Sequence, residues 1–249
     1  MSSLTPVMRE NASARMQPLA EVDDTCVVFN GGEKPFYALN HLTLALYPRQ
    51  LTFVFGSSGC GKTTLLNVLG GMITPDSGTV LFRGNDISHL SQRQKTRYRR
   101  DSVGFIFQRY NLIASLTARE NVMVSASLTP GSMNPLEALD LVGLRHKADA
   151  YPHQMSGGEQ QRVCIARAIC KNAGLILADE PTGALDVENA RNVMTVLERL
   201  VHENGQTVLV VTHNPDLAPM ADRVITMRDG RIVKDETNPN PLSARECLG

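Results

Sequence analysis

Gly56-Ser-Ser-Gly-Cys-Gly-Lys-Thr63 is the stretch that decides the fold, and it directly follows the apolar run Leu51-Thr-Phe-Val-Phe55. It matches the phosphate-binding pattern G-x-x-x-x-G-K-[ST], in which glycines let successive backbone N–H groups point at phosphate oxygens. Residues 62–69 are expected to form a helix that stops at Gly70-Gly71, with its positive end facing the anion. An ordinary glycine turn is the competing interpretation, but a strand before and a helix after are the context that the motif requires.

Three further apolar runs share a feature with this one, because each delivers polar residues at its end. The runs and the residues that follow them are 103–107 with Gln108, 175–178 with Asp179 and Glu180, and 207–212 with His213. Near-continuous apolar runs are typical of strands buried on both faces, as in a parallel sheet. Helical stretches separate the runs, which predicts an α/β fold. Because ligands bind at the carboxyl ends of such strands, we expect these polar residues to converge on one site.

Asp179-Glu180 places two carboxylates directly after a buried apolar run. One carboxylate in this position can hold a Mg²⁺ shell, and its neighbour can orient or deprotonate an attacking water. Taken alone, an acidic pair after a strand is usually a turn or a helix start. In a chain that also has a phosphate-binding loop, metal binding and activation of water become the leading interpretation of this pair.

Ser156-Gly-Gly-Glu159 has the spacing of a capping box and predicts a helix from Ser156 through about Cys170. Two glycines inside a helix start are poor helix formers. They make sense if bare backbone N–H groups must approach an anion at the positive end of the helix. A capped helix with a tolerated glycine pair is the alternative.

Composition narrows the classes of function. The 249 residues carry 25 Lys plus Arg and 25 Asp plus Glu, and this zero net charge argues against binding to nucleic acid by bulk positive charge. No apolar run approaches the roughly 20 residues of a membrane span, and the first twenty residues lack the apolar core of a secretory signal. Five cysteines without C-x-x-C spacing are typical of a reducing compartment, and a metal held by side chains alone is not expected.

Taken together and in this order, the motifs resemble an ABC transporter ATPase over about residues 24–234. The matching positions are 56–63, Gln108, 155–160, 175–180, 183–186 and His213, which in that family are the Walker A loop, Q-loop, signature, Walker B strand, D-loop and H-loop. The stretch 104–112, with 116–117 and 120–122, is similar to one branch in particular. That branch contains the macrolide-exporter, lipoprotein-releasing, antimicrobial-peptide-resistance and cell-division ATPases.

The resemblance implies a P-loop NTPase (RecA-like) core with a mostly parallel sheet, an antiparallel β subdomain and an inserted α-helical subdomain at about 109–158. It places the nucleotide-binding domain at 21–237. A flexible N-terminal arm at 1–20 and a flexible C-terminal tail at 238–249 are expected on either side, because both stretches lack a periodic apolar pattern.

The resemblance also implies a site for ATP and Mg²⁺ that two copies, associated head to tail, complete for each other. The expected catalytic residues are Glu180, which polarises water, His213, which contacts the γ-phosphate, Gln108 and Lys62. The expected metal ligands are Thr63, Gln108 and Asp179. The expected nucleotide-binding residues are Phe29, Gly56, Ser57, Ser58, Gly59, Cys60, Gly61, Lys62, Thr63, Thr64, Ser156, Gly157, Gly158, Glu159 and Asp186. Phe29 is assigned by position to stack on the adenine, with Phe36 and Tyr37 as rivals and a buried core Phe as the alternative.

For function, the resemblance implies the ATP-hydrolysing subunit of a transporter whose permease is a separate chain. The expected location is the cytoplasmic face of the membrane, as a peripheral subunit of an exporter or of a lipid, lipoprotein or peptide extruder of the mechanotransmission type. The alternative is a non-transporting ATPase that signals across the membrane to an extracytoplasmic complex, as in cell division. The substrate and the direction of transport depend on the membrane chain and are not encoded in these residues.

The groove near Gln108 and the basic run 93–100 can each be interpreted in two ways. The groove near Gln108 is expected to receive the permease, and its apolar lining would be Tyr110, Leu112, Ile113 and Leu116, which could equally pack the helical subdomain. The basic run 93–100 is either a solvated helix face or a contact for anionic lipid headgroups. No nucleic-acid partner is expected.

Overall fold

The computed structural model describes residues 17–30 and 35–248. Most of the arm expected at 1–20 lies outside these residues. Of its last four residues, Leu19 is buried and Ala20 already begins the first strand, so the ordered domain starts slightly earlier than expected. Among the described residues, no helix combines the length and the apolar character that crossing a bilayer requires.

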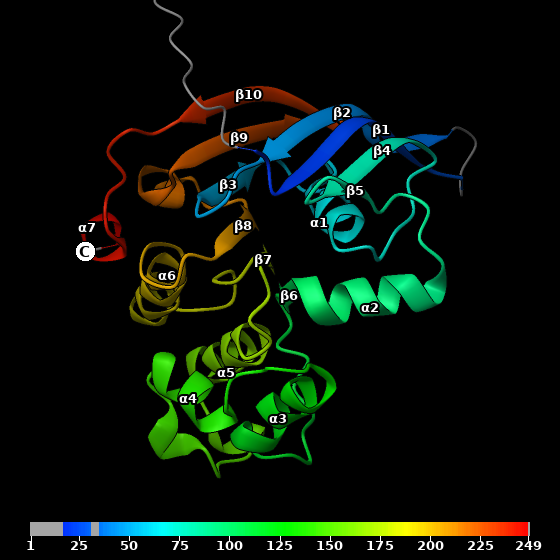
Figure 1. The fold of residues 1–249 in the computed structure, drawn as a ribbon. Coiled ribbons are helices and arrows are strands. Elements are labelled where there is room, and N and C mark those ends of the chain that lie inside the picture. The colour runs from blue at the N-terminus through cyan, green and yellow to red at the C-terminus, as the bar shows by residue number, and fades with distance from the viewer. Residues whose placement is uncertain (1–16, 31–34, 249) are drawn as a thin grey trace, which may run out of the picture.

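A six-stranded sheet forms the centre of the molecule, in the order β10-β9-β3-β8-β7-β6 (Figure 1). Its strands are β3 (Leu51–Phe55), β6 (Val103–Ile106), β7 (Leu175–Asp179), β8 (Thr207–Thr212), β9 (Arg223–Arg228) and β10 (Arg231–Thr237). All neighbours pair in parallel except β10, which runs antiparallel to β9 at the edge. The mostly parallel sheet predicted from the apolar runs is therefore confirmed.

The parallel strands read as continuous apolar runs because both of their faces are covered. In β8, Val208 and Val210 belong to one core, and Leu209 and Val211 to another on the opposite face. The first core continues into the α-helices below the sheet. The second fills the space towards a four-stranded antiparallel sheet and contains much of α1 (Lys62–Leu69).

The second sheet is the expected antiparallel β subdomain, in the order β2-β1-β4-β5. Its strands are β1 (Ala20–Phe29), β2 (Phe36–Leu46), β4 (Ser77–Phe82) and β5 (Asn85–Asp86). Together the two sheets enclose α1, so that the helix behind the glycine loop is held from both sides (Figure 1).

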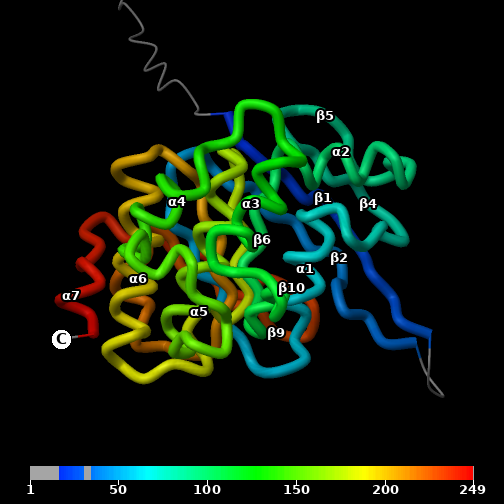
Figure 2. The backbone as a smooth tube through the Cα atoms, turned by 90° about the horizontal axis from the view of Figure 1, so that it is seen from below, coloured from blue at the N-terminus to red at the C-terminus, as the bar shows by residue number. Residues whose placement is uncertain are grey.

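Most of the remaining helices lie on the other face of the central sheet or project below it, whereas the helix Gln92–Ser102 packs on the α1 side through Tyr98. They are α2 (Gln92–Ser102), α3 (Ala118–Leu128), α4 (Pro135–Leu141), α5 (Gly157–Ile169), α6 (Val187–His202) and α7 (Ala244–Cys247), with the short 3₁₀ turns Arg145–Lys147, Pro152–Gln154 and Pro215–Met220. Helices α3, α4 and α5 pack on one another. They form a helical unit at the lower end of the molecule, and the view from below places α3, α4 and α5 next to one another (Figure 2).

The C-terminal tail differs from the expectation of a flexible segment. Its residues 244–247 form α7, which packs on α6, and Ala244 is fully buried. The Arg191 guanidinium of α6 donates to the Leu248 carbonyl, and the Ala244 N–H donates to Glu198 at 3.1 Å. A capping box between Ser243 and Glu246 supplies the local start signal, which the prolines upstream hid in the sequence.

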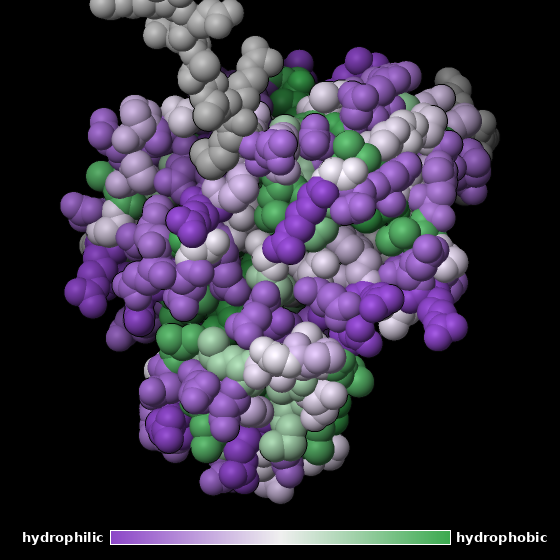
Figure 3. Space-filling view, in the orientation of Figure 1, coloured by the Kyte–Doolittle hydropathy of each residue, from purple (hydrophilic) through white to green (hydrophobic). Residues whose placement is uncertain are grey.

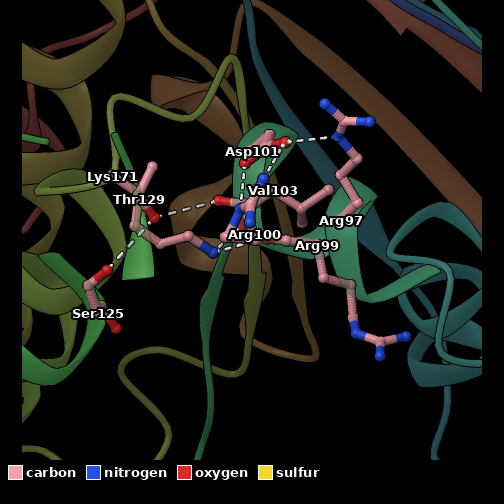
Figure 4. A network of polar contacts seen from close by, with 8 residues as sticks. All are labelled: Arg97, Arg99, Arg100, Asp101, Val103, Ser125, Thr129 and Lys171. Atoms are coloured by element: carbon pink, nitrogen blue, oxygen red, sulfur yellow. Dashed lines mark hydrogen bonds and ion pairs between the residues drawn. The ribbon is translucent and has the colours of Figure 1, made fainter. Parts of the chain in front are cut away.

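The basic run 93–100 lies in α2 and is only partly a solvated face. Lys95 and Tyr98 are buried, while Arg97 and Arg100 both lie beside the carboxylate of Asp101 (Figure 4). Lys171, from the end of the helical unit, donates to the carbonyl oxygens of Arg99 at 2.6 Å and Val103 at 2.7 Å. This ammonium therefore ties the end of α2 to the helices below.

Candidate phosphate-binding site

A pocket of about 570 Å³ lies at the carboxyl edge of the central sheet. It is lined by Phe29, Phe36, Ala38, Ser58, Gly59, Gly61, Lys62, Thr63, Thr64, Gln108, Asp179, Glu180 and His213. The polar residues that follow β3, β6, β7 and β8 thus meet in one place, as expected from their positions at parallel strand ends. Of the expected residues in the glycine loop, Gly56, Ser57 and Cys60 are not part of this lining.

The glycine loop is held in a shape that suits an anion at the start of α1. Gly61 has a φ of 108°, and a Cβ at this position would lie 2.1 Å from the carbonyl oxygen of Ala38. No side chain caps α1, and its first turn contains no acidic residue. The positive end of the helix therefore faces the pocket without a competing carboxylate of its own.

Lys62 supplies the positive charge at the centre of the loop. Its buried ammonium donates to the carbonyl oxygens of Gly56 at 2.7 Å and Ser57 at 3.0 Å. Cys60, also buried, lies 4.0 Å from the same nitrogen through its Sγ. The loop's own carbonyls hold the cation in place, so that a phosphate entering the pocket meets a positioned charge.

Thr63 and Asp179 form the part of the pocket that fits a hard cation. The Thr63 hydroxyl donates to Asp179 Oδ1 at 3.3 Å, and Gln108 lies in the same lining. Burial raises the pKa of the Asp179 carboxyl, against the opposing effect of the Thr63 hydrogen bond. A hydroxyl, a carboxylate and an amide oxygen are ligands that Mg²⁺ accepts, and a divalent ion would offset the cost of the buried charge.

Glu180 and His213 form a pair at the mouth of the pocket. Glu180 Oε1 lies 2.8 Å from His213 Nδ1, while Glu180 Oε2 is buried without a hydrogen-bond partner among the described residues. The backbone of Glu180 adopts a φ of 46°, a conformation that side chains other than Gly rarely take, and its N–H donates to Val211 O at 2.9 Å. A buried, unpaired carboxylate oxygen that opens onto a pocket is suited to accept a proton from a water molecule.

The aromatic candidates lie at the other end of the pocket. Phe29 and Phe36 face each other across β1 and β2 and both line the pocket, with 48% and 54% of their surface exposed. Tyr37 is also exposed but is not part of the lining. The alternative of a buried core Phe at position 29 is therefore wrong, and Phe36 has the same access as Phe29.

Ser156 to Glu159 fold as predicted, although they lie outside this pocket. The Ser156 hydroxyl accepts from the Glu159 N–H at 3.2 Å, and Glu159 Oε2 accepts from the Ser156 N–H at 2.8 Å. The latter bond lowers the pKa of the Glu159 carboxyl. Ser156 is exposed at the start of α5, so its first turn is available to a molecule outside the chain.

Both glycines of this motif have neighbours that the sequence did not reveal. A Cβ at Gly157 would lie 2.7 Å from Tyr110 Oη, and one at Gly158 would lie 2.1 Å from Asn189 Oδ1. Asn189 is in turn bound to Asp186, the N-cap of α6, through its backbone N–H at 2.9 Å and its side-chain amide at 2.7 Å. Asp186 thus lies beside the glycine pair and not in the pocket.

Of the apolar residues expected to line a groove near Gln108, only Ile113 is exposed. Leu112 packs against the core, while Tyr110 and Leu116 are half-buried. The sequence missed Met123 and Val124 of α3, which are 46% and 41% exposed. Their helix is amphipathic only in part, so nothing in the local pattern marked these two positions as outward-facing.

Comparison with known proteins supports the resemblance to ABC transporter ATPases inferred from the motifs. Residues 39–183 match the family described as ABC transporter. The chain is 41% identical over 237 residues to the macrolide export ATP-binding/permease protein MacB of Rhodospirillum rubrum, covering 93% of this chain and 36% of that protein. It is 44% identical over 202 residues to the protein of the same name from Campylobacter jejuni, covering 79% and 31%. The chain therefore spans about a third of the length of these relatives.

Solved structures match over nearly their whole length. The dimeric post-hydrolysis state of the ATP-binding cassette MJ0796, bound to ADP and Pi, is 36% identical with a TM-score of 0.81, and the match covers 88% of this chain and 98% of that one. The structure of cbiO1 from Clostridium perfringens, part of the complex cbiONQ, is 25% identical with a TM-score of 0.78, covering 92% and 90%.

Proposed function

The chain belongs to the ABC transporter family, and from this premise we propose that two copies associate head to tail, hydrolyse ATP and thereby drive a separate membrane permease. ATP binding and hydrolysis are properties of the ATP-binding cassette that this chain shares with its structural neighbours. The proposal concerns which residues act, how the two copies share them and what they drive.

One observation carries the proposal: the pocket is lined by the proposed catalytic side chains, while the second candidate anion-binding helix start, at Ser156, lies outside the described lining. The two halves of an ATP site are present in the chain at separate places, the pocket at Lys62 and the exposed start of α5 at Ser156. A head-to-tail pair brings the α5 start of one copy over the pocket of the other. The dimeric cassette bound to ADP and Pi supports the association of two copies.

Within the pocket, the side chains divide the work. Lys62 and the N–H groups at the start of α1 bind the β- and γ-phosphates, and the α5 start of the second copy closes over the γ-phosphate. Glu180 Oε2 orients the attacking water and takes its proton, while His213 holds Oε1 of the same carboxylate. Mg²⁺, held by Thr63, Asp179 and Gln108, would neutralise charge on the transferred phosphoryl group. Phe29 and Phe36 offer a face for the adenine.

The partner that this ATPase drives would dock on the helical unit. Figure 3 shows apolar surface over that unit, next to the hydrophilic surface over α2. Ile113 from the Gln108 loop and Met123 and Val124 from α3 are exposed apolar residues of this region. Because the relatives named above are macrolide export proteins with a permease part, we propose an exporter-type permease as the partner and the cytoplasmic face of the membrane as the location.

The shared site is tested by mixing two inactive variants. Ser156→Arg places a bulky cation at the α5 start and is expected to spare ATP binding by the single chain while abolishing hydrolysis. Lys62→Ala is expected to remove ATP binding. A mixed dimer of the two contains one site in which both halves are intact, so ATPase activity is expected to return on mixing, provided that one site suffices for turnover.

Dilution of the wild-type protein provides the matching measurement. Hydrolysis per chain is expected to fall as the protein is diluted below the concentration at which it dimerises. Turnover per chain that does not change with concentration, in a preparation shown to be monomeric, would contradict the shared site.

A further inference from the structure

The loop that follows β6 is fastened to helix α5 at its carbonyl groups. The Arg167 guanidinium donates to the Asn111 carbonyl at 2.6 Å through Nη1 and to the Tyr110 carbonyl at 3.1 Å through Nη2. The Cys164 thiol donates to the same Tyr110 carbonyl at 2.7 Å. Two side chains of one helix thus hold two consecutive peptide groups of the loop.

These donors are available at any ordinary pH. Burial raises the pKa of the Cys164 thiol to about 12, so the proton stays on the sulfur and the S–H group remains a donor. Arg167 forms no ion pair with a carboxylate within the described part of the chain, and two of its N–H groups are directed at the loop carbonyls. Hydrogen bonds from a charged donor are the stronger kind.

The same loop also touches the first turn of α5. Tyr110 Oη lies 2.7 Å from the position that a Cβ would take at Gly157, so a larger residue there would displace the tyrosine hydroxyl. Gly157, Cys164 and Arg167 are seven and three residues apart, a spacing that places them along one side of a helix over about 15 Å. The loop is therefore bonded to α5 at Cys164 and Arg167 and lies against the first turn of the helix at Gly157.

Gln108 lies two residues before Tyr110 and lines the pocket. Two residues of chain span no more than about 7 Å, so a displacement of Gln108 is passed on to Tyr110 over a short distance. We propose that Arg167 and Cys164 are positioning residues that fix the loop carrying Gln108 to helix α5. Through them, contact of the nucleotide with Gln108 and placement of the Ser156 turn over the second copy's pocket become one movement. This inference rests on the proposed shared site.

Arg167→Ala tests the inference, with Arg119→Ala as the matched control. Arg119 lies on α3 of the same helical unit, and its side chain pairs with the exposed Asp149 at 2.8 Å. Arg167→Ala is expected to lower kcat on the order of tenfold with less than a twofold change in equilibrium ATP binding by the single chain, because the pocket keeps all its ligands. Arg119→Ala is expected to change neither, and Arg167→Lys, which keeps a charged donor, should recover part of kcat.

A second readout separates positioning from loss of fold. The measurement uses a Glu180→Gln background, which should hold ATP without turnover. In this background, Arg167→Ala is expected to raise the ATP concentration for half-maximal dimer formation about fivefold. The melting temperature should not change. A drop in kcat that merely follows a loss of folded protein would overturn the inference, as would unchanged kcat in Arg167→Ala. If Arg167→Ala does not fold, Cys164→Ala against Cys164→Ser decides, with a drop of about threefold expected for Ala alone.

The two levels of proposal fail in different ways. If the Glu180→Gln variant alone stays monomeric at saturating ATP, the shared site itself is contradicted. If Glu180→Gln dimerises normally and the added Arg167→Ala leaves the ATP dependence of dimer formation unchanged, only the role of Arg167 is overturned.

Discussion

Helices α1 and α5 both begin at glycine-rich turns, but the two starts are built differently. The start of α1 has Gly61 as its N-cap, no side-chain cap and no acidic residue in its first turn. The start of α5 has Ser156 as its N-cap, a full capping box and the carboxylate of Glu159. Around α1 stand Lys62, Asp179, Glu180 and His213, whereas the described pocket does not reach α5. In the proposed function, the helix end at α1 carries the chemistry, and the helix end at α5 closes the site of a second copy.

Glu180→Gln should break the chemistry of the α1 side and produce the largest effect. The amide keeps the size and the contact with His213, but it cannot take a proton from water. Hydrolysis is expected to fall by roughly 10²–10⁴, the loss typical of a general base, while ATP affinity is retained. Phosphate release and equilibrium ATP binding measure the two quantities on one preparation. Normal turnover would remove Glu180 from this role.

The difference between the two helix starts explains which parts of the site could be predicted from the sequence. The α1 side was predictable because each of its groups follows a strand, and the order of strands in a parallel sheet brings strand ends together without further information. Five residues of the loop 56–63 meet Gln108, Asp179, Glu180 and His213 in the pocket. The helix limits at 62–69 and the start of α5 after Ser156 were predictable for a similar reason, since glycine stops and capping boxes act locally.

What the sequence could not give are contacts between segments far apart in the chain. Asn189 against Gly158 and Arg167 against the Tyr110 carbonyl depend on how α5 packs on α6 and on the loop after β6. Neither residue type indicates such a contact, because asparagine and arginine are common on helix surfaces. The C-terminal tail was missed because α7 gains its stability from packing on α6, and its four residues are too few to show a period.

Gly158→Ala should damage the α5 side while leaving the α1 side intact. An added Cβ would lie within 2.1 to 2.7 Å of three atoms of the Asn189 side chain, so the start of α5 must shift against α6. We expect a loss of hydrolysis on the order of tenfold with unchanged ATP binding by the single chain, in line with about 1–3 kcal/mol for overpacking.

The double variant Gly158→Ala with Asn189→Ala sharpens this test. Removal of the Asn189 amide relieves two of the three close contacts and leaves only the Asn189 Cβ at 2.7 Å, so part of the lost activity is expected to return. Activity of the double variant below that of Gly158→Ala alone would show that the amide matters for holding Asp186 and not for the space beside Gly158.

Glu159→Gln addresses the carboxylate that α5 has and α1 lacks, and its effect on stability should be the smallest. Because hydrogen bonding to the Ser156 N–H lowers the pKa of Glu159 below its usual 4.5, the charged form stabilises the folded state. This contribution is present above pH 4.5 and is lost as the pH falls through the folded-state pKa. We therefore expect Gln to cost about 0.5 kcal/mol at pH 7, a value that allows for solvent screening at this position, and nothing near pH 3, as measured by urea unfolding.

The same charge should have the opposite effect on closure of the shared site. A carboxylate at the positive end of α5 repels an approaching phosphate, so Glu159→Gln is expected to lower the ATP concentration for half-maximal dimer formation about twofold at low salt. Glu120→Gln is the matched control, because Glu120 forms the same capping box with Thr117 at the start of α3 and its pKa is lowered by the same kind of hydrogen bond. It should share the pH dependence of stability without any change in dimer formation. An equal shift in both variants would mean that the α5 start does not meet the phosphate.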